Sequence, residues 1–202
     1  MNSKIILFDI DGTIFNSDQL ANFFWPKFLD IFRTDKKTLD KVVNQYFLTL
    51  ETGTDFNPND FLSNLASTFQ VSKKIIEKVF YSKEIYIKCI YPEVKSVLEK
   101  LQKEYILGIF SEGFNEFQSK KLKLTELMGY FETKYVFIFR RKLSEENLKI
   151  LPSNSLIIDN SLKVIKDLPK NINRIWINRN NENSIGYDQI SDLNELITNQ
   201  LI

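Results

Sequence analysis

The segment from Lys4 to Thr13 constrains the fold more strongly than any other part of this chain. Its sequence is KIILFDIDGT, and the apolar run Ile5–Phe8 is typical of a strand buried on both faces, so we predict a strand over residues 4–10. Asp9 and Asp11 lie two positions apart, which in a strand places both carboxylates on one face, about 6–7 Å apart. Two adjacent buried anions need compensating positive charge, and a divalent cation such as Mg²⁺ is the usual source.

Two structures are open for the residues that follow. Gly12 lets the backbone turn without a Cβ, and Thr13 offers a hydroxyl to an anion, as a binding site would require. Alternatively, Asp11-Gly12 between two apolar runs favours a β-hairpin turn. A hairpin gives no role to Asp9 inside the apolar run, so we favour the site.

Beyond residue 92, helical and strand patterns alternate along the chain. We predict helices over residues 93–104, 115–128, 161–168 and 188–200, and strands over residues 105–110, 134–139, 155–159 and 173–178. With the first strand these segments predict a parallel α/β sheet covered by helices on both faces. Such sheets bind ligands beyond the carboxyl ends of their strands.

Polar residues follow two of the other apolar strands. Ser111 follows the strand expected over residues 105–110, and Asp159 follows the mostly apolar residues Ser155–Ile158. Each has a structural alternative, because Ser111 could cap the helix from residue 115 and Asp159 or Asn160 could cap the helix after it. Three strands that all end in oxygen-bearing side chains are harder to explain as three independent caps.

The sequence Asp9-Ile10-Asp11-Gly12-Thr13 matches the first motif, D-x-D-G-T, of the haloacid dehalogenase-like (HAD) hydrolase superfamily, which the chain resembles over its whole length. The resemblance implies a three-layer Rossmann-like parallel sheet with a small all-helical cap inserted after the first strand. It also implies that Asp9 is the nucleophile and Asp11 the general acid/base. It further implies Mg²⁺ bound by Asp9, Asp11 and Asp159, and phosphate contacts from Thr13, Ser111, Glu112 and Lys142.

The basic residue of the third family motif has three candidates, Arg140, Arg141 and Lys142, after the strand that ends at residue 139. We favour Lys142 because Lys-Leu-Ser-Glu resembles the family's lysine followed closely by a helix start. A basic triplet is more often a solvated surface, and only one of the three side chains can reach the site.

The chain departs from the family pattern near Asp159. Many members carry a second acid next to this aspartate or four or five residues further on, where this chain has Asn160, Lys163 and Val164. The resemblance then implies a metal site with one carboxylate fewer than usual, weaker Mg²⁺ binding and slower turnover. Glu112 is a second departure, because the family often has a small polar residue there.

Residues 16–90 contain no strand pattern, and their apolar residues recur at helical spacing. We therefore expect a core domain formed by residues 1–15 and 91–202 and a helical cap formed by residues 16–90. Trp25, which precedes Pro26, is expected either in the core of this cap or at the entrance to the site.

The composition excludes several functional classes. The chain has 202 residues, 43% of them hydrophobic and 26% charged, and a net charge of +1, which gives no electrostatic case for nucleic acid or an anionic membrane. It has no histidine, which excludes Ser-His-Asp and Cys-His catalysis and histidine-based zinc sites. The single cysteine, Cys89, precludes an intrachain disulfide. We expect no signal peptide, no membrane span and a cytoplasmic location.

The function implied by the resemblance is that of a Mg²⁺-dependent phosphatase, which hydrolyses a small phosphorylated metabolite through an aspartyl-phosphate. Dehalogenases of the superfamily lack the second aspartate, so Asp11 favours phosphate chemistry. A phosphomutase of the same superfamily and a weakly active HAD-like binding protein remain alternatives. The sequence does not indicate the physiological substrate or the oligomeric state.

Overall fold

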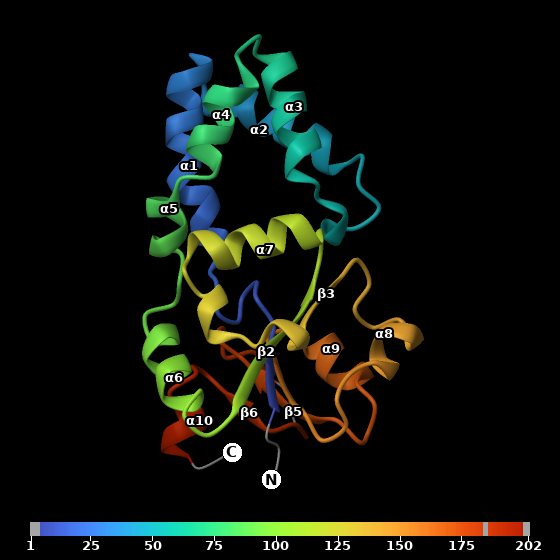
Figure 1. The fold of residues 1–202 in the computed structure, drawn as a ribbon. Coiled ribbons are helices and arrows are strands. Elements are labelled where there is room, and N and C mark those ends of the chain that lie inside the picture. Colours follow the sequence, from blue (N-terminus) through green and yellow to red (C-terminus); the bar gives the residue numbers. More distant parts are fainter. Residues whose placement is uncertain (1–4, 184–185, 200–202) are drawn as a thin grey trace.

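The computed structural model describes residues 5–183 and 186–199, and in these residues it contains a six-stranded parallel sheet (Figure 1). The strands are ordered β3-β2-β1-β4-β5-β6. Their bounds are β1 (Ile5–Phe8), β2 (Ile106–Glu112), β3 (Val136–Phe139), β4 (Leu156–Asp159), β5 (Asn173–Ile177) and β6 (Gln189–Ile190). Because β1 pairs in parallel with β2 and β4, the hairpin alternative is wrong.

Helices cover both faces of this sheet, which confirms the predicted three-layer α/β fold. Ile6 and Phe8 pack in one hydrophobic cluster with residues of α6 and α10, whereas Leu7 packs in a second cluster with Val164 of α9. Alternate residues of a strand point to opposite faces, so the two clusters are the two sides of the sheet. The helices of this region are α6 (Val94–Leu101), α7 (Asn115–Leu124), α8 (Glu145–Lys149), α9 (Leu162–Asp167) and α10 (Glu195–Thr198).

Several boundaries differ from the sequence-based expectations. The expected helix over 188–200 is wrong, because Gln189–Ile190 pairs with β5 as the edge strand β6 and only Glu195–Thr198 is helical. The strand expected over 105–110 extends to Glu112. Turns of 3-10 helix lie at Met128–Tyr130 and Thr133–Tyr135, where a longer helix and a longer strand were expected. Lys4, the first residue of the expected first strand, lies outside the described residues, and so does residue 200, the last of the expected C-terminal helix.

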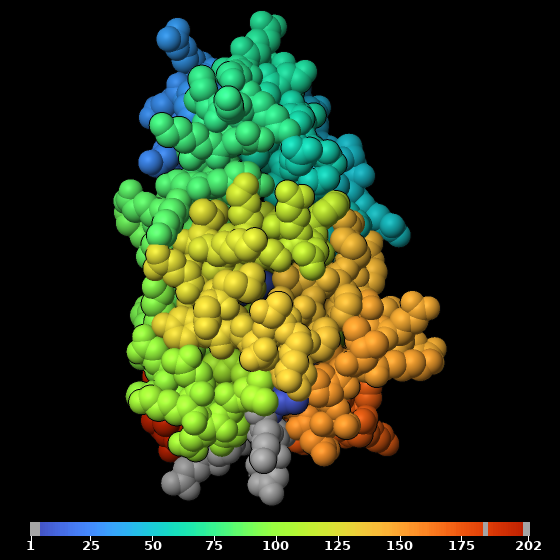
Figure 2. Space-filling view, viewed as in Figure 1, coloured from blue at the N-terminus to red at the C-terminus, as the bar shows by residue number. Residues whose placement is uncertain are grey.

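Between β1 and β2 the chain forms a group of helices that we call the helical insert, Ser17–Lys88. It contains α1 (Ser17–Phe32), α2 (Lys36–Phe47), the 3-10 turn η1 (Gly53–Asp55), α3 (Pro58–Thr68), α4 (Lys73–Phe80) and α5 (Lys83–Lys88). Figure 1 shows it at one end of the sheet, and Figure 2 shows its blue to green surface resting on the yellow and orange segments of the rest of the chain.

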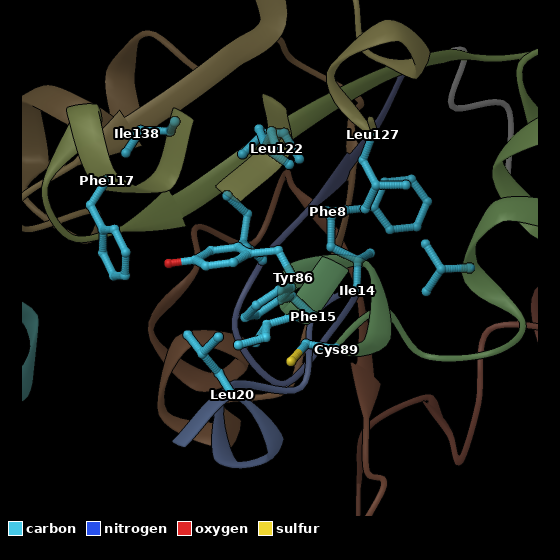
Figure 3. Packing of buried hydrophobic residues seen from close by; sticks show 14 of the residues in the cluster. Phe8, Ile14, Phe15, Leu20, Tyr86, Cys89, Phe117, Leu122, Leu127 and Ile138 are labelled. Atoms are coloured by element: carbon cyan, nitrogen blue, oxygen red, sulfur yellow. The ribbon is translucent and has the colours of Figure 1, made fainter. Parts of the chain in front are cut away.

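The hydrophobic core continues from the sheet into the helical insert (Figure 3). Phe15, in the loop after β1, lies 5.7 Å from the ring of Tyr86 in α5, and Phe80 of α4 lies 6.0 Å from Phe117 of α7. These ring contacts fix the insert over the strand ends. None of the described helices is long and apolar enough to cross a membrane.

Candidate active site

Asp9, Asp159 and Lys142 come from three different strand ends and meet in one buried cluster. The backbone N–H of Asp9 bonds to the carbonyl of Ile158 over 2.9 Å, so Asp9 and Asp159 end adjacent parallel strands. Lys142 Nζ lies 2.9 Å from Asp9 Oδ1 and 2.5 Å from Asp159 Oδ2. The exposed fractions of these residues are 5% or less, so the ammonium is shielded from water and its attraction to the two carboxylates is strong.

The two partners of this ion pair respond differently to burial. The pKa of Asp9 is raised to about 7, mainly by burial, with smaller contributions from the Asp159 and Asp11 carboxylates and against the attraction of Lys142. Burial would lower the pKa of Lys142, but the Asp9 and Asp159 carboxylates outweigh it and hold this pKa above its ordinary value. Lys142 is therefore the fixed positive charge of the site.

Asp11 belongs to a second polar cluster beside the first. Its carboxylate accepts hydrogen bonds from Lys121 Nζ at 2.5 Å, from Gln118 Nε2 at 2.6 Å and from the hydroxyl of Ser17. Burial would raise the pKa of Asp11, but Lys121 and the hydrogen bonds outweigh it and lower this pKa. The structure thus separates the two aspartates of the D-x-D motif into different electrostatic environments.

Lys121 and Gln118 were not predicted from the sequence. Both lie on α7, three residues apart and therefore on one face of the helix, next to the buried Phe117 and Leu122. Two long polar side chains on the apolar face of a helix were the signal that could have indicated a partner at the site.

The turn after the nucleophile candidate requires glycine at position 12. Gly12 has a φ of +78°, and a Cβ there would lie 2.2 Å from Asn160 Nδ2. The next residue is held by Arg179, which donates to the Thr13 carbonyl over 2.7 Å and to Glu93 Oε1 over 2.6 Å. The turn is therefore packed against the loop that follows Asp159.

Ser111 and Asp159 do not act as helix caps, so both alternative interpretations are wrong. The N-cap of α7 is Phe114, and the N-cap of α9 is Ser161, whose backbone N–H donates to Asp159 Oδ1 over 2.8 Å. Ser111 Oγ is buried and forms no hydrogen bond with the described residues. An unpaired buried hydroxyl is costly, and a phosphoryl oxygen would satisfy it.

A cavity of about 440 Å³ lies between the strand ends and the helical insert. Six of the seven predicted site residues line it, namely Asp9, Asp11, Ser111, Glu112, Lys142 and Asp159. Thr13 is buried and its hydroxyl forms no hydrogen bond with residues 5–183 or 186–199, but it does not line this cavity. A volume of this size is typical of a small-molecule site.

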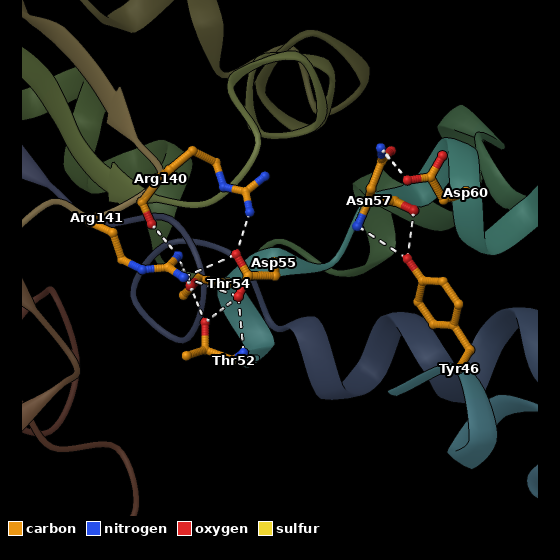
Figure 4. A network of polar contacts seen from close by, with 8 residues as sticks. All are labelled: Tyr46, Thr52, Thr54, Asp55, Asn57, Asp60, Arg140 and Arg141. Carbon is orange, nitrogen blue, oxygen red and sulfur yellow. Dashed lines mark hydrogen bonds and ion pairs between the residues drawn. The ribbon is translucent and has the colours of Figure 1, made fainter. Parts of the chain in front are cut away.

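Arg140 and Arg141, the neighbours of Lys142, point toward Asp55 of the helical insert (Figure 4). Both form ion pairs with Asp55 of η1, and Arg141 Nη2 lies 3.0 Å from Asp55 Oδ2. Of the basic triplet, Lys142 alone is placed by the structure against Asp9 and Asp159. The two arginines instead join the strand end to the helical insert.

The side chains around Lys142 fit a magnesium ion that has few protein ligands. Among residues 5–183 and 186–199, no group of three or more His, Cys, Asp or Glu side chains converges on one point. Lys121 holds the Asp11 carboxylate, and Lys142 contacts one oxygen of Asp9 and one of Asp159, so a metal ion would share these two carboxylates with the ammonium. Mg²⁺ is often bound by one or two carboxylates together with water and substrate phosphate, so this donor set suits it.

Comparisons with known proteins identify the family and agree with this fold. Residues 6–138 match the family described as haloacid dehalogenase-like hydrolase. The chain therefore belongs to the haloacid dehalogenase-like hydrolases. No curated protein sequence matches the chain.

Solved structures with the same fold match almost the full chain. A HAD phosphatase from Thermococcus onnurineus is 25% identical, with a TM-score of 0.66 over 98% of this chain and 97% of that one. The putative HAD-hydrolase YfnB from Bacillus subtilis, bound to magnesium, is 17% identical, with a TM-score of 0.67 over 100% of both chains. An L-2-haloacid dehalogenase from Xanthobacter autotrophicus is 16% identical, with a TM-score of 0.56 over 96% of both chains. The last two similarities support the fold alone.

Proposed function

We propose that this hydrolase is a magnesium-dependent phosphatase that acts on a small phosphate monoester and has Asp9 as its nucleophile. The observation that supports it most directly is the buried cluster in which Lys142 contacts both Asp9 and Asp159. A fixed cation beside the nucleophile can neutralise both the carboxylate and an incoming phosphoryl group. The metal is proposed by analogy with the YfnB protein, which has the same fold and whose structure is bound to magnesium.

In the proposed reaction, Asp9 Oδ attacks phosphorus, the bond from phosphorus to the ester oxygen breaks, and the leaving alcohol takes a proton from Asp11. Water then attacks the aspartyl-phosphate, Asp11 accepts the proton of the water, and inorganic phosphate and Asp9 are released. In the free protein, Lys121 and Gln118 favour ionised Asp11, the form required for the second step. The first step therefore requires substrate binding to weaken the contact with Lys121.

The remaining site residues are assigned to binding. Ser111 Oγ, the backbone N–H of Glu112 and Lys142 Nζ would hold the phosphoryl oxygens, with Thr13 supporting the turn. Mg²⁺ would be held by Asp9, Asp159 and the backbone carbonyl of Asp11. The ion would supply positive charge that offsets repulsion between the carboxylates and the phosphate. Asp11 favours phosphatase over dehalogenase chemistry, because halide leaves without a proton.

The test is an Asp9→Asn variant, assayed with acetyl phosphate and Mg²⁺. Because the amide is not a nucleophile, we expect turnover to fall by at least about 10³-fold. Asp40→Asn, at an exposed position on α2, is the matched control and should keep its activity. Near-normal hydrolysis by the Asp9→Asn protein would rule out the mechanism.

One observation favours a second candidate, a weakly active HAD-like binding protein. Lys142 already compensates Asp9 and Asp159, and Asn160 stands where many relatives supply a further acid. Calorimetric titration with Mg²⁺ separates the candidates. Binding below millimolar concentration supports the phosphatase, and no heat of binding up to millimolar metal supports the binding protein.

A further inference from the structure

Resting on the proposed function, we propose that the alcohol part of the substrate is apolar and aromatic rather than a sugar. The cavity is chemically divided. Its charged groups lie at the strand ends, where the phosphate would bind, whereas the helical insert supplies most of the wall that would face the alcohol. That wall therefore selects the substrate.

Aromatic rings form most of the wall that would face the alcohol. They include Phe24, Trp25, Phe56, Phe61, Phe80 and Phe117. They already contact one another, with centroids 4.6 Å apart for Phe24 and Trp25 and 5.7 Å apart for Phe56 and Phe117. Aromatic side chains favour further rings at such distances in tilted or stacked geometry. A planar apolar group would extend this cluster into the cavity.

The same wall offers few partners for hydroxyl groups. Of the described residues that the insert contributes, only Ser17, Thr54 and Trp25 carry polar side-chain atoms. The Ser17 hydroxyl is bonded to Asp11, and Thr54 Oγ1 accepts from Arg141 Nη1 over 2.9 Å. The Trp25 indole N–H adds a single donor, so the several hydroxyls of a sugar would lose most of their hydration here without replacement, which disfavours binding.

The polar groups near the strand ends are also largely occupied. Gln118 Nε2 and Lys121 Nζ both donate to Asp11, and Gln118 Nε2 also donates to the Glu112 carbonyl over 2.9 Å. Two buried polar atoms there form no hydrogen bond with the described residues, the Ser111 hydroxyl and Gln118 Oε1. The hydroxyl can donate to the phosphate, and the amide oxygen, which only accepts, leaves one partner for a substrate hydroxyl. The alcohol is therefore recognised by contact with rings.

Three substrates test this inference on the magnesium-loaded protein. Acetyl phosphate reports the phosphoryl chemistry with little contribution from substrate recognition, because its leaving group, acetate, is small and carries no ring. 2-Phenylethyl phosphate and glucose 6-phosphate are both esters of primary alcohols, so that the same kind of bond is broken in each. We expect kcat/KM for the phenylethyl ester to exceed that for the sugar ester by at least about tenfold, the usual scale of discrimination in an apolar pocket.

Two cavity variants and one control link the preference to this wall. Phe56→Gln and Trp25→Gln should each lower the ratio of the two kcat/KM values about tenfold. Phe69→Gln is the matched control, because Phe69 stacks on Phe32 at 4.4 Å and does not line the cavity, and it should leave the ratio unchanged.

The outcomes separate the two proposals. If acetyl phosphate is hydrolysed but the sugar ester is used as well as the phenylethyl ester, the inference is wrong and the phosphatase stands. It is also wrong if both cavity variants keep the wild-type ratio. If acetyl phosphate is not hydrolysed, the proposed function fails and the inference fails with it.

Discussion

Asp9 is the residue at which folding and the proposed chemistry oppose each other. Burial next to Asp159 favours its protonated form, although a nucleophile must be ionised. Lys142 reduces this conflict without removing it, since the pKa of Asp9 stays raised at about 7. In the proposed mechanism, magnesium at the same carboxylates would supply the charge that Lys142 alone does not provide.

This raised pKa predicts a pH-dependent cost in stability for the metal-free protein. Between the ordinary pKa of 3.8 and the folded value of about 7, folded Asp9 keeps a proton that the unfolded chain has lost. The contribution of Asp9 to stability therefore falls as pH rises across this window and is constant above it. The amide of the Asp9→Asn variant cannot titrate, so the melting temperature of this variant minus that of the wild type should increase from about pH 4 to pH 7.

The measurement is thermal unfolding in EDTA across this pH range. Subtracting the wild type removes the contributions of the other titrating groups, because both proteins share them. A difference that stays constant between pH 4 and 7 would show that the pKa of Asp9 is not raised in the fold.

A second prediction concerns Gly12, whose φ of +78° and contact with Asn160 both exclude a Cβ. Gly12→Ala should destabilise the fold by roughly 2 kcal/mol or more, from the strained backbone and the clash. Adding Asn160→Ala removes the clash alone and should recover part of this loss. Urea unfolding measures both effects, and an unchanged midpoint in Gly12→Ala would contradict the prediction.

At the scale of helices and strands, the sequence predicted those elements that show a clear periodic pattern of apolar residues. The long apolar strands and amphipathic helices around the sheet were found, because their periodicity is local. The edge strand β6 was missed, since its two residues pair with Trp176 and Ile177 of β5, and the N–H of Asn178 after β5 bonds to the Ile190 carbonyl over 2.7 Å. Such pairing depends on the folded sheet and leaves little local pattern.

The same distinction explains what was found of the site. Motif residues at strand ends were predicted because parallel strands bring their carboxyl ends together. The contacts of Asp11 with Lys121 and Gln118 join residues 110 and 107 positions apart, and only the packing of α7 beneath the helical insert creates them. No fixed sequence spacing relates residues in long-range contacts of this kind, so the contacts could not be predicted from the sequence.

The 3-10 turn η1 is the element that connects the helical insert to a strand end through charge. Asp55 pairs with Arg140 and Arg141, and hydrogen bonds with Arg141 are the main cause that lowers the pKa of Asp55. A lowered pKa means that this contact is present above the ordinary pKa of 3.8 and is lost only in stronger acid. The turn is therefore fixed at neutral pH, together with Thr54 in the cavity wall.

Asp55→Asn should loosen this wall with little effect on the chemical step. We expect KM for a phosphate ester to rise by about two- to fivefold while kcat is kept, because exposed ion pairs contribute modest energies. Salt should raise KM in the wild type more than in the variant, since screening weakens the same contact. Asp60→Asn is the control, because Asp60 bonds only to Asn57 within the insert in Figure 4. Equal salt dependence in all three proteins would contradict this role.

At the scale of the whole molecule, the site exists because two packed regions share one hydrophobic core. Phe117 on α7 contacts Phe56 and Phe80 of the helical insert, at 5.7 Å and 6.0 Å between ring centroids. The same cluster includes Phe8 of the central strand (Figure 3). A core that is continuous in this way predicts that the insert and the sheet unfold together.

The two tryptophans report on the two regions separately, because Trp25 lies in the helical insert and Trp176 in β5 of the sheet. In Trp25→Phe and Trp176→Phe proteins, the remaining tryptophan should give the same urea midpoint as far-UV circular dichroism of that protein. Phe117→Ala removes the shared ring and should lower both midpoints together. The corresponding loss in the free energy of unfolding should be about 3–5 kcal/mol. Leu48→Ala, at a position that is 85% exposed, should change neither. If Trp25 reports a lower midpoint than Trp176, the insert unfolds on its own, and the cavity wall then depends on local packing rather than on the shared core.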